Sequence, residues 1–249
     1  MRKVLVLVAF ATLALAQAAQ AQTNFQTFYD FGRNRKHFTT TLEGFYNDNW
    51  GNTFFFIDYD YNGDNSNNGG GKNLASGSYF EIARCLNFWK DSALKNFSAH
   101  VEYNGGVGFP SQNFLFGIDY FVHNADFSNT FNFKILYKTF SKGTKSDLPM
   151  QFTFVWGMQD LFGVKGLRFS GFADFWGETA YAWAEDQTSE NYKKESKFTF
   201  LSEPQLWYNI GSLFGCENLH VGGEVELSWN FAGYYGFAVR PCLGTKWVF

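Results

Sequence analysis

Three features that would point to other classes of protein are scarce or missing in this sequence. Beyond residue 22, no apolar run approaches the roughly 20 residues that a transmembrane helix requires. The 20 Lys and Arg residues do not outnumber the 23 Asp and Glu residues, so no basic surface indicates a nucleic-acid partner. The three cysteines, Cys85, Cys216 and Cys242, are an odd number in 249 residues and too few for a disulfide scaffold.

The first residues have the pattern of a secretory signal peptide. A charged start, Met1-Arg2-Lys3, precedes an apolar run over 4–16 that is too short to span a membrane. Ala19-Gln20-Ala21 supplies the small residues that a signal peptidase needs. We therefore expect residues 1–21 to be removed and residues 22–249 to form the exported domain. Losing Arg2 and Lys3 takes the formal charge from −3 to −5.

Aromatic residues are unusually abundant, with 32 Phe, 13 Tyr and 8 Trp. The chain ends in Lys246-Trp247-Val248-Phe249. A terminal Phe on an alternating last strand resembles the signal read by the barrel assembly machinery of the outer membrane. With no candidate helix, these features predict an outer-membrane β-barrel in contact with lipid, with Phe249 as its signal to that machinery.

Alternation with a period of two supports this fold class. In one segment Phe131, Phe133, Ile135 and Tyr137 share a face, and polar residues dominate the other. Such a pattern is typical of a strand between lipid and water. It repeats twelve times, which predicts an all-β, antiparallel, up-and-down transmembrane barrel of about twelve strands. The segments are 24–31, 38–46, 53–61, 78–89, 97–104, 113–123, 130–139, 150–158, 167–176, 197–208, 220–230 and 237–249.

The connections and tryptophans suit the same scheme. With periplasmic termini, external loops should be long and periplasmic turns short. The polar stretches 62–77 and 177–196 fall outside, whereas 47–52 and 125–129 fall on the periplasmic side; the turn 212–219 is longer than expected. Aromatic girdles are predicted from Trp89, Trp156 and Trp247 at periplasmic strand ends and from Trp176 and Trp229 at external ones.

Arg84 contradicts the alternation. If Glu81 and Cys85 face the lumen, Arg84 faces lipid near the middle of its segment, where an arginine costs about 2 to 4 kcal/mol. We therefore expect either a β-bulge that turns Arg84 inward or an error in the phase assigned to this strand.

The predicted lumen is acidic and partly aromatic. Twelve strands enclose a space narrower than that of a sixteen-stranded porin, so a small passage is expected. The inward acids are Asp30, Glu43, Asp58, Asp60, Glu81, Glu102, Asp119, Asp174, Glu203, Glu224 and Glu226. The inward bases are Lys134, Lys138, Arg168, Arg240 and Lys246, and the inward aromatics are Phe28, Phe45, Phe54, Phe56, Phe121, Phe172 and Trp207.

Two interpretations of these lumen residues stay open. Aromatic faces can stack on planar solutes for about 1 to 3 kcal/mol, by analogy with single-strand nucleic-acid binders. Acidic walls repel phosphate, which would favour nucleosides over nucleotides. Alternatively, the charges pair with one another and the aromatic rings only fill space.

Several blocks resemble the Tsx-like nucleoside-specific channel family. They are Thr41-Leu42-Glu43-Gly44-Phe45, Trp50 to Phe56 with Asp58-Tyr59-Asp60, Phe80-Glu81-Ile82-Ala83-Arg84, and Leu167 to Trp176 with Gly171-Phe172-Ala173-Asp174. Their order also matches, and together they span most of the exported chain. The resemblance implies a monomeric twelve-stranded barrel that passes nucleosides. It also implies that Glu43, Phe45, Asp58, Asp60, Glu81 and Asp174 line the passage, to which the strand phase adds Phe54, Phe56 and Phe172.

Other motifs are incomplete. The stretch from Asp58 to Gly63 matches half of an EF-hand loop, but Gly69 stands where the last ligand should be Glu. The stretch from Gly69 to Lys72 lacks the Walker spacing. The cysteines are expected to be small buried residues, with one disulfide as an alternative. No metal site or cofactor is predicted.

The sequence is compatible with three functions. A diffusion channel is favoured by the acidic and aromatic lumen. A lipid hydrolase would need a Ser-His pair on the lipid side, whereas His100, His123 and His220 fall on the lumen side without a paired serine, so no enzyme is expected. The third function that the sequence allows is a plugged structural or adhesin-like barrel.

Overall fold

The computed structural model describes residues 22–32, 35–61, 75–107, 112–141 and 144–249. The predicted signal peptide lies outside these residues. So do the Asn/Gly-rich stretch 62–74 and, with it, the second half of the EF-hand-like motif and the glycines before Lys72.

The described chain is almost entirely β-structure. Among these residues no helix is long and apolar enough to cross a membrane. The only helical segments described are two short 3-10 turns, η2 (Leu161–Gly163) and η3 (Gly211–Phe214). The strands are β1 (Gln22–Asp30), β2 (Phe38–Asp48), β3 (Gly51–Tyr61), β4 (Gly77–Leu86), β5 (Phe97–Val107), β6 (Asn113–His123), β7 (Asn129–Lys138), β8 (Met150–Met158), β9 (Leu167–Tyr181), β10 (Glu195–Ser202), β11 (Gln205–Tyr208), β12 (Leu219–Trp229) and β13 (Phe237–Val248).

β10 and β11 are two parts of one interrupted strand. Both pair with β9 on one side and with β12 on the other, and the register is the same before and after the break. The break falls at Glu203-Pro204 because proline has no backbone N–H for the ladder. Opposite it, a Cβ on Gly171 would lie 2.5 Å from the Glu203 carbonyl oxygen, so glycine permits β9 to pass closely. The predicted single strand over 197–208 is thereby confirmed.

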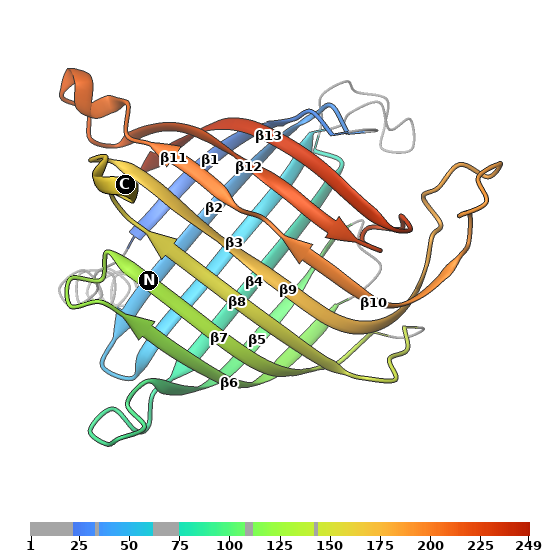
Figure 1. Ribbon diagram of the computed structural model, residues 1–249, viewed down its shortest axis with the longest axis horizontal. Helices are drawn as coiled ribbons and strands as arrows, with labels where there is room; N and C mark the ends of the chain where they lie inside the picture. The colour runs from blue at the N-terminus through green and yellow to red at the C-terminus, as the bar shows by residue number, and fades with distance from the viewer. Residues whose placement is uncertain (1–21, 33–34, 62–74, 108–111, 142–143) are drawn as a thin grey trace, which may run out of the picture.

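The twelve strands close into one antiparallel barrel. Each strand pairs with its neighbour in sequence, and β1 pairs with β13 to complete the ring. Figure 1 shows the strands strongly tilted around the closed wall. Closure leaves no free sheet edge, which is the condition for a sheet to cross a bilayer. The predicted fold class and strand number are confirmed.

Both ends of the described chain lie at the same end of the barrel, where the Phe249 N–H donates to the Thr23 carbonyl at 2.9 Å. This end carries the tight turn between β2 and β3 and is called the periplasmic end, following bacterial barrels. The opposite end carries the segment between β9 and β10, which extends far from the wall in Figure 1. The connections 87–96 and 209–218 make the periplasmic end less compact than predicted.

The outer wall is apolar. Phe133, Ile135 and Tyr137 of β7 are each more than half exposed, whereas the intervening Leu136 is fully buried. The same outward apolar pattern appears on β6 with Phe114, Phe116 and Ile118. An apolar belt around a closed barrel is what a bilayer requires. The protein is therefore an outer-membrane barrel, as the alternation predicted.

The expected bulge at Arg84 is wrong. Pairing of β3 with β4 runs without a shift from Gly51↔Leu86 to Asp60↔Gly77, so Arg84 faces outward. It lies near the periplasmic end of β4, not at mid-strand, because β4 stops at Leu86. Its guanidinium donates to Asp48 at 2.9 Å and to Thr53 at 3.1 Å. Reaching the interface in this way avoids most of the cost of a lipid-facing charge.

The girdle prediction is also wrong for one residue. Trp89, Trp229 and Trp247 are exposed on the outside, and Trp156 contacts the outward Phe154 and Phe169. Trp176, however, lies two residues after Asp174 in β9 and therefore points to the same inward side, and it is only 7% exposed. It fills the interior instead of the membrane interface.

The closed ladder predicts the behaviour of the protein on gels. We expect the folded protein in detergent to migrate differently before and after boiling, because a ring without edges has no strand from which to open. Circular dichroism should show β-structure and almost no helix. A mainly helical spectrum, or identical migration of boiled and unboiled samples, would contradict the closed barrel.

Candidate functional site: the barrel interior

All nine residues predicted to line the passage occupy inward positions. The ladder of β2 with β3 aligns Phe45 with Phe54, and Phe56 lies between Glu43 and Glu81 on the neighbouring strands. On the opposite wall, Phe172 and Asp174 of β9 share the inward face. Glu43, Phe45, Phe54, Phe56, Asp58, Asp60, Glu81, Phe172 and Asp174 are all partly accessible. Their role in binding a solute stays a prediction.

The inward carboxylates on this part of the wall are held by neutral donors. Asn24 donates to Glu43 at 2.8 Å, and Thr41 donates to Asp58 at 2.6 Å. Across the barrel, Thr153 donates to Asp174 at 2.5 Å. Each donor stands on the adjacent strand, so register fixes the position of the acid. These contacts orient the carboxylates without neutralising them.

The inward aromatic rings form a run along β3 and β4. The Phe54 and Phe56 centroids are 6.0 Å apart, and Phe56 lies 5.7 Å from Tyr79. Phe28 and Trp207 differ from this group because they are nearly completely buried against each other, 5.5 Å apart. For that pair the space-filling interpretation holds. The rings of β3 and β4 are instead accessible from the interior.

The accessible inward residues line the barrel interior, which we call the chamber. A packed layer stands on the inner wall of β6 to β9 toward the external end. Leu115 and Leu136 point into this layer and have no exposed surface. Lys138 lies 3.9 Å from the Trp176 ring centroid and donates to Gln151 at 2.9 Å. We call Leu115, Leu136, Lys138, Gln151 and Trp176 the outer layer. Side chains, not backbone, therefore narrow the interior here.

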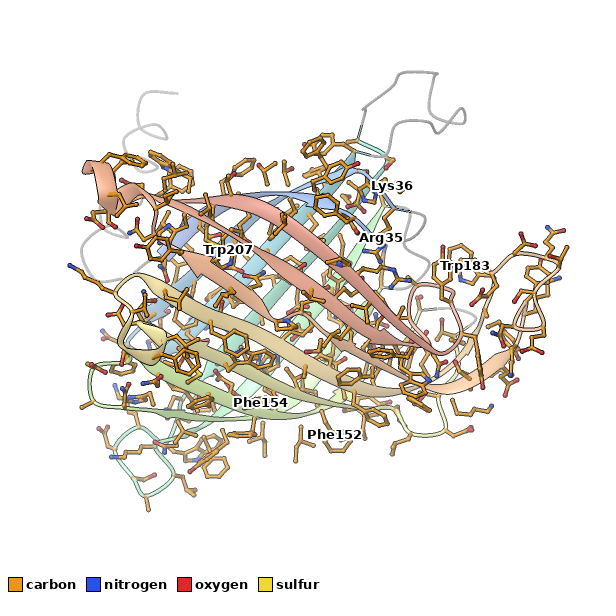
Figure 2. The ribbon with its side chains drawn as sticks, turned by 45° about the horizontal axis from the view of Figure 1, so that its top comes forward. Arg35, Lys36, Phe152, Phe154, Trp183 and Trp207 are labelled. Carbon is orange, nitrogen blue, oxygen red and sulfur yellow. The ribbon has the colours of Figure 1, made fainter. Side chains whose placement is uncertain are left out.

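The connection between β1 and β2 adds charge at the external mouth. Arg35 lies 3.3 Å from Asp30 and 2.8 Å from Glu226, and Arg240 also bonds Glu226. Figure 2 shows Arg35 beside the barrel rim. A hydrogen bond to Asp60, opposed by burial, raises the pKa of His37 in the same connection.

The inward charges are unevenly paired. Among the described residues, Asp30, Asp60, Glu102 and Glu226 have an Arg or His nitrogen within ion-pair distance. No described Lys, Arg or His nitrogen lies within that distance of the other inward acids. These are Glu43, Asp58, Glu81, Asp119, Asp174, Glu203 and Glu224. The pairing interpretation thus holds for part of the lumen only.

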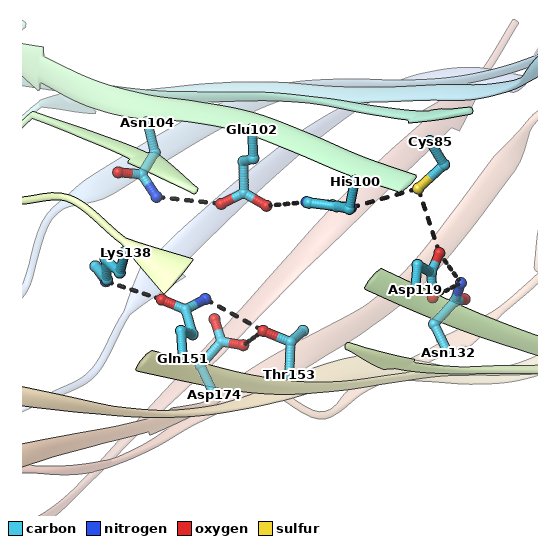
Figure 3. A network of polar contacts seen from close by, with 10 residues as sticks. All are labelled: Cys85, His100, Glu102, Asn104, Asp119, Asn132, Lys138, Gln151, Thr153 and Asp174. Carbon is cyan, nitrogen blue, oxygen red and sulfur yellow. Dashed lines mark hydrogen bonds and ion pairs between the residues drawn. The ribbon is translucent and has the colours of Figure 1, made fainter. Parts of the chain in front are cut away.

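A chain of polar contacts on β4 to β7 was not predicted from the sequence (Figure 3). Asn104 donates to Glu102, Glu102 contacts His100 at 2.9 Å, and His100 contacts Cys85 at 3.4 Å. Cys85 in turn contacts Asp119 at 3.3 Å. Alternation along the sequence places four polar residues on one face of β5, namely Ser98, His100, Glu102 and Asn104. Which residues they contact depends on the register between strands.

The histidines show no serine partner. His123 contacts the Asn124 carbonyl and His220 the Asn218 carbonyl, and His100 contacts Cys85 and Glu102. None of the hydrogen bonds of the described residues joins these histidines to a serine. None of the three cysteines forms a disulfide, so the alternative of one disulfide is wrong.

The barrel is similar in fold to a solved porin. A NanC porin superposes with a TM-score of 0.53 at 8% identity, covering 90% of this chain and 98% of that one. A KdgM porin in complex with disordered oligogalacturonate gives a TM-score of 0.48 at 10% identity, with 92% and 99% covered. OccAB3 from Acinetobacter baumannii gives 0.40 at 9% identity, with 94% and 99% covered. At these identities the likeness concerns the fold alone.

No curated protein is significantly similar to the chain. A family model described as "Domain of unknown function (DUF5020)" matches residues 16–249. Because this match covers nearly the whole sequence, the chain belongs to the DUF5020 family.

Proposed function

We propose that the protein is a narrow outer-membrane channel that passes small neutral or cationic polar solutes, with nucleosides as the best-suited class. The observation that carries this proposal is the chamber of accessible acids and aromatic rings inside a closed barrel. Its inward acids outnumber their cationic partners, and its rings lie on β3, β4 and β9. This arrangement agrees with the resemblance to the Tsx-like family noted in the sequence.

Electrostatics supports selection against anions. Asp58 lies within electrostatic range of Glu43, Asp60 and Glu224, and Glu81 within that of Glu102 and Asp174. Charges in a confined space with low dielectric are weakly screened. A phosphate entering between these walls would meet like charge from both sides, whereas a ribose hydroxyl could donate to the same carboxylates.

The aromatic rings supply the second part of the preference. Phe54, Phe56 and Asp58 share the inward face of β3, and the two rings lie 6.0 Å apart. A planar base that stacks there gains about 1 to 3 kcal/mol by analogy with single-strand binders. A sugar of similar size lacks that face. The chamber therefore favours solutes that combine a flat ring with hydroxyl donors.

Rates of solute entry into liposomes test this preference. In liposomes containing the purified protein, adenosine should enter faster than a hexose, and adenosine monophosphate more slowly than either, for the reasons above. Phe56→Ala should reduce the advantage of adenosine over the hexose by several-fold. Asp58→Asn combined with Asp174→Asn should reduce the discrimination against the monophosphate.

Phe152→Ala is the matched control for the aromatic change because Phe152 is 43% exposed on the outer wall. It should leave the three rates in the same order. Equal rates for all three solutes that no inward variant alters would reduce the proposal to an unselective pore.

Substitution of Trp176 separates a channel from a plugged barrel. Trp176→Ala removes the largest side chain of the outer layer together with its contact with Lys138. We expect a larger single-channel conductance and weaker selectivity in planar bilayers. If the native protein conducts nothing and Trp176→Ala alone opens it, the wild-type barrel is plugged and its function structural.

Incubation with lipid tests the enzyme alternative. Phospholipid or lipopolysaccharide incubated with the pure protein should stay intact, since among the described residues no histidine ring is hydrogen-bonded to a serine. Fatty acid release that disappears in a single histidine variant would support a hydrolase.

A further inference from the structure

A thiol, an imidazole and a carboxylate converge on the inner wall of β4, β5 and β6. Their ligand atoms are Cys85 Sγ, one ring nitrogen of His100 and one Asp119 oxygen, and all lie within 4.8 Å of one another. The three residues are 3%, 1% and 1% exposed. The channel proposed above uses none of them. Sulfur, nitrogen and oxygen together are donors that proteins use for zinc.

The two distances from sulfur suit one tetrahedral ion. With a Zn–S bond of about 2.3 Å and Zn–N or Zn–O bonds of about 2.0 Å, tetrahedral angles place sulfur about 3.5 Å from the other two ligands. Cys85 Sγ lies 3.4 Å from His100 Nδ1 and 3.3 Å from Asp119 Oδ2. An ion could therefore replace the present contacts with little movement of the strands.

Neighbouring side chains already orient the ligands. Glu102 contacts His100 Nε2 at 2.9 Å, which leaves Nδ1 directed at Cys85. Asn132 donates to both Asp119 oxygens, at 2.9 and 2.8 Å. A carboxylate on the second nitrogen of a metal-bound histidine, and an anchored carboxylate ligand, are the usual outer partners of zinc sites.

Lys134 is a nearby cation that opposes a metal, since it stands directly opposite Asp119 in the ladder. Charge balance removes this objection. Binding displaces the Cys85 proton to solvent and forms a Zn–S bond, so the thiolate, Asp119 and Glu102 carry three negative charges. Zn²⁺ and Lys134 carry three positive charges. The loaded site would be neutral, as a buried site requires.

From this geometry we infer that Cys85, His100 and Asp119 form a binding site for one zinc ion, positioned by Glu102 and Asn132. Three protein ligands leave a fourth position for water or a solute group. The site joins three adjacent strands, so a bound ion would cross-link the wall of the barrel from inside.

Cobalt replaces zinc as a spectroscopic probe. We propose to refold the full barrel with Co²⁺ and, separately, to titrate Co²⁺ into the folded protein. One ion per barrel should bind and show thiolate-to-cobalt charge transfer with the absorption of tetrahedral Co²⁺, and Zn²⁺ should displace it. No charge-transfer band under either condition would overturn the proposal.

Variants locate the site. Cys85→Ser should abolish the charge-transfer band. The matched control is Cys242→Ser, because Cys242 is also an inward cysteine without a disulfide, and it should keep the band. Glu102→Gln should weaken binding about 10- to 100-fold while keeping the spectrum, as for other outer partners of metal sites. Heat-dependent gel migration shows that each variant has folded, and a folded Cys85→Ser barrel with an unchanged band would reject the site.

Discussion

Closure of the β1–β13 ladder is the constraint on which the rest of the structure depends. Asn24 to Asp30 pair with Val248 to Cys242, and without this seam two strands would present unpaired N–H and C=O groups to lipid. Each unsatisfied group would cost several kcal/mol there. Closure also fixes the register of every strand, and period two then sends each side chain either to lipid or to the interior. Both the apolar belt and the polar chamber follow from that division.

Many polar side chains of the interior are buried from water, so they form hydrogen bonds with one another. Asn24, Gln26 and Glu43 form one such chain through contacts of 2.7 and 2.8 Å. Few described groups fail to find a partner, among them Gln26 Oε1 and Asn113 Oδ1. Most donors are neutral amides and hydroxyls, so the carboxylates gain hydrogen bonds without an ion-pair partner. This is why the chamber can be well ordered although its acidic residues outnumber their cationic partners.

The sequence predicted the features that follow from the alternation of residues along a strand. It missed the features that depend on where strands end and on which residues of different strands meet. The inward positions of Asp58 and Phe172 follow from alternation alone. Arg84 was misjudged because its strand ends three residues earlier than predicted, at Leu86, which moves it to the interface. Trp176 was assigned to the girdle by its place near a strand end, although its parity with Asp174 already pointed inward. The Cys85–His100–Asp119 cluster joins residues from three strands, and only register brings them together.

Whether the outer layer blocks the barrel or only narrows it depends on what holds it. The wall is fixed by continuous ladders, and moving it would break many backbone bonds together. Lys138, in contrast, is held over Trp176 by a cation–π contact and by one hydrogen bond to Gln151. Such contacts are worth roughly 0.5 to 2 kcal/mol each. Side chains held this weakly can change rotamer while the barrel stays closed, so the outer layer can rearrange without any strand moving. In the proposed channel the ladders would therefore supply a rigid wall, and a solute would displace only side chains of the outer layer.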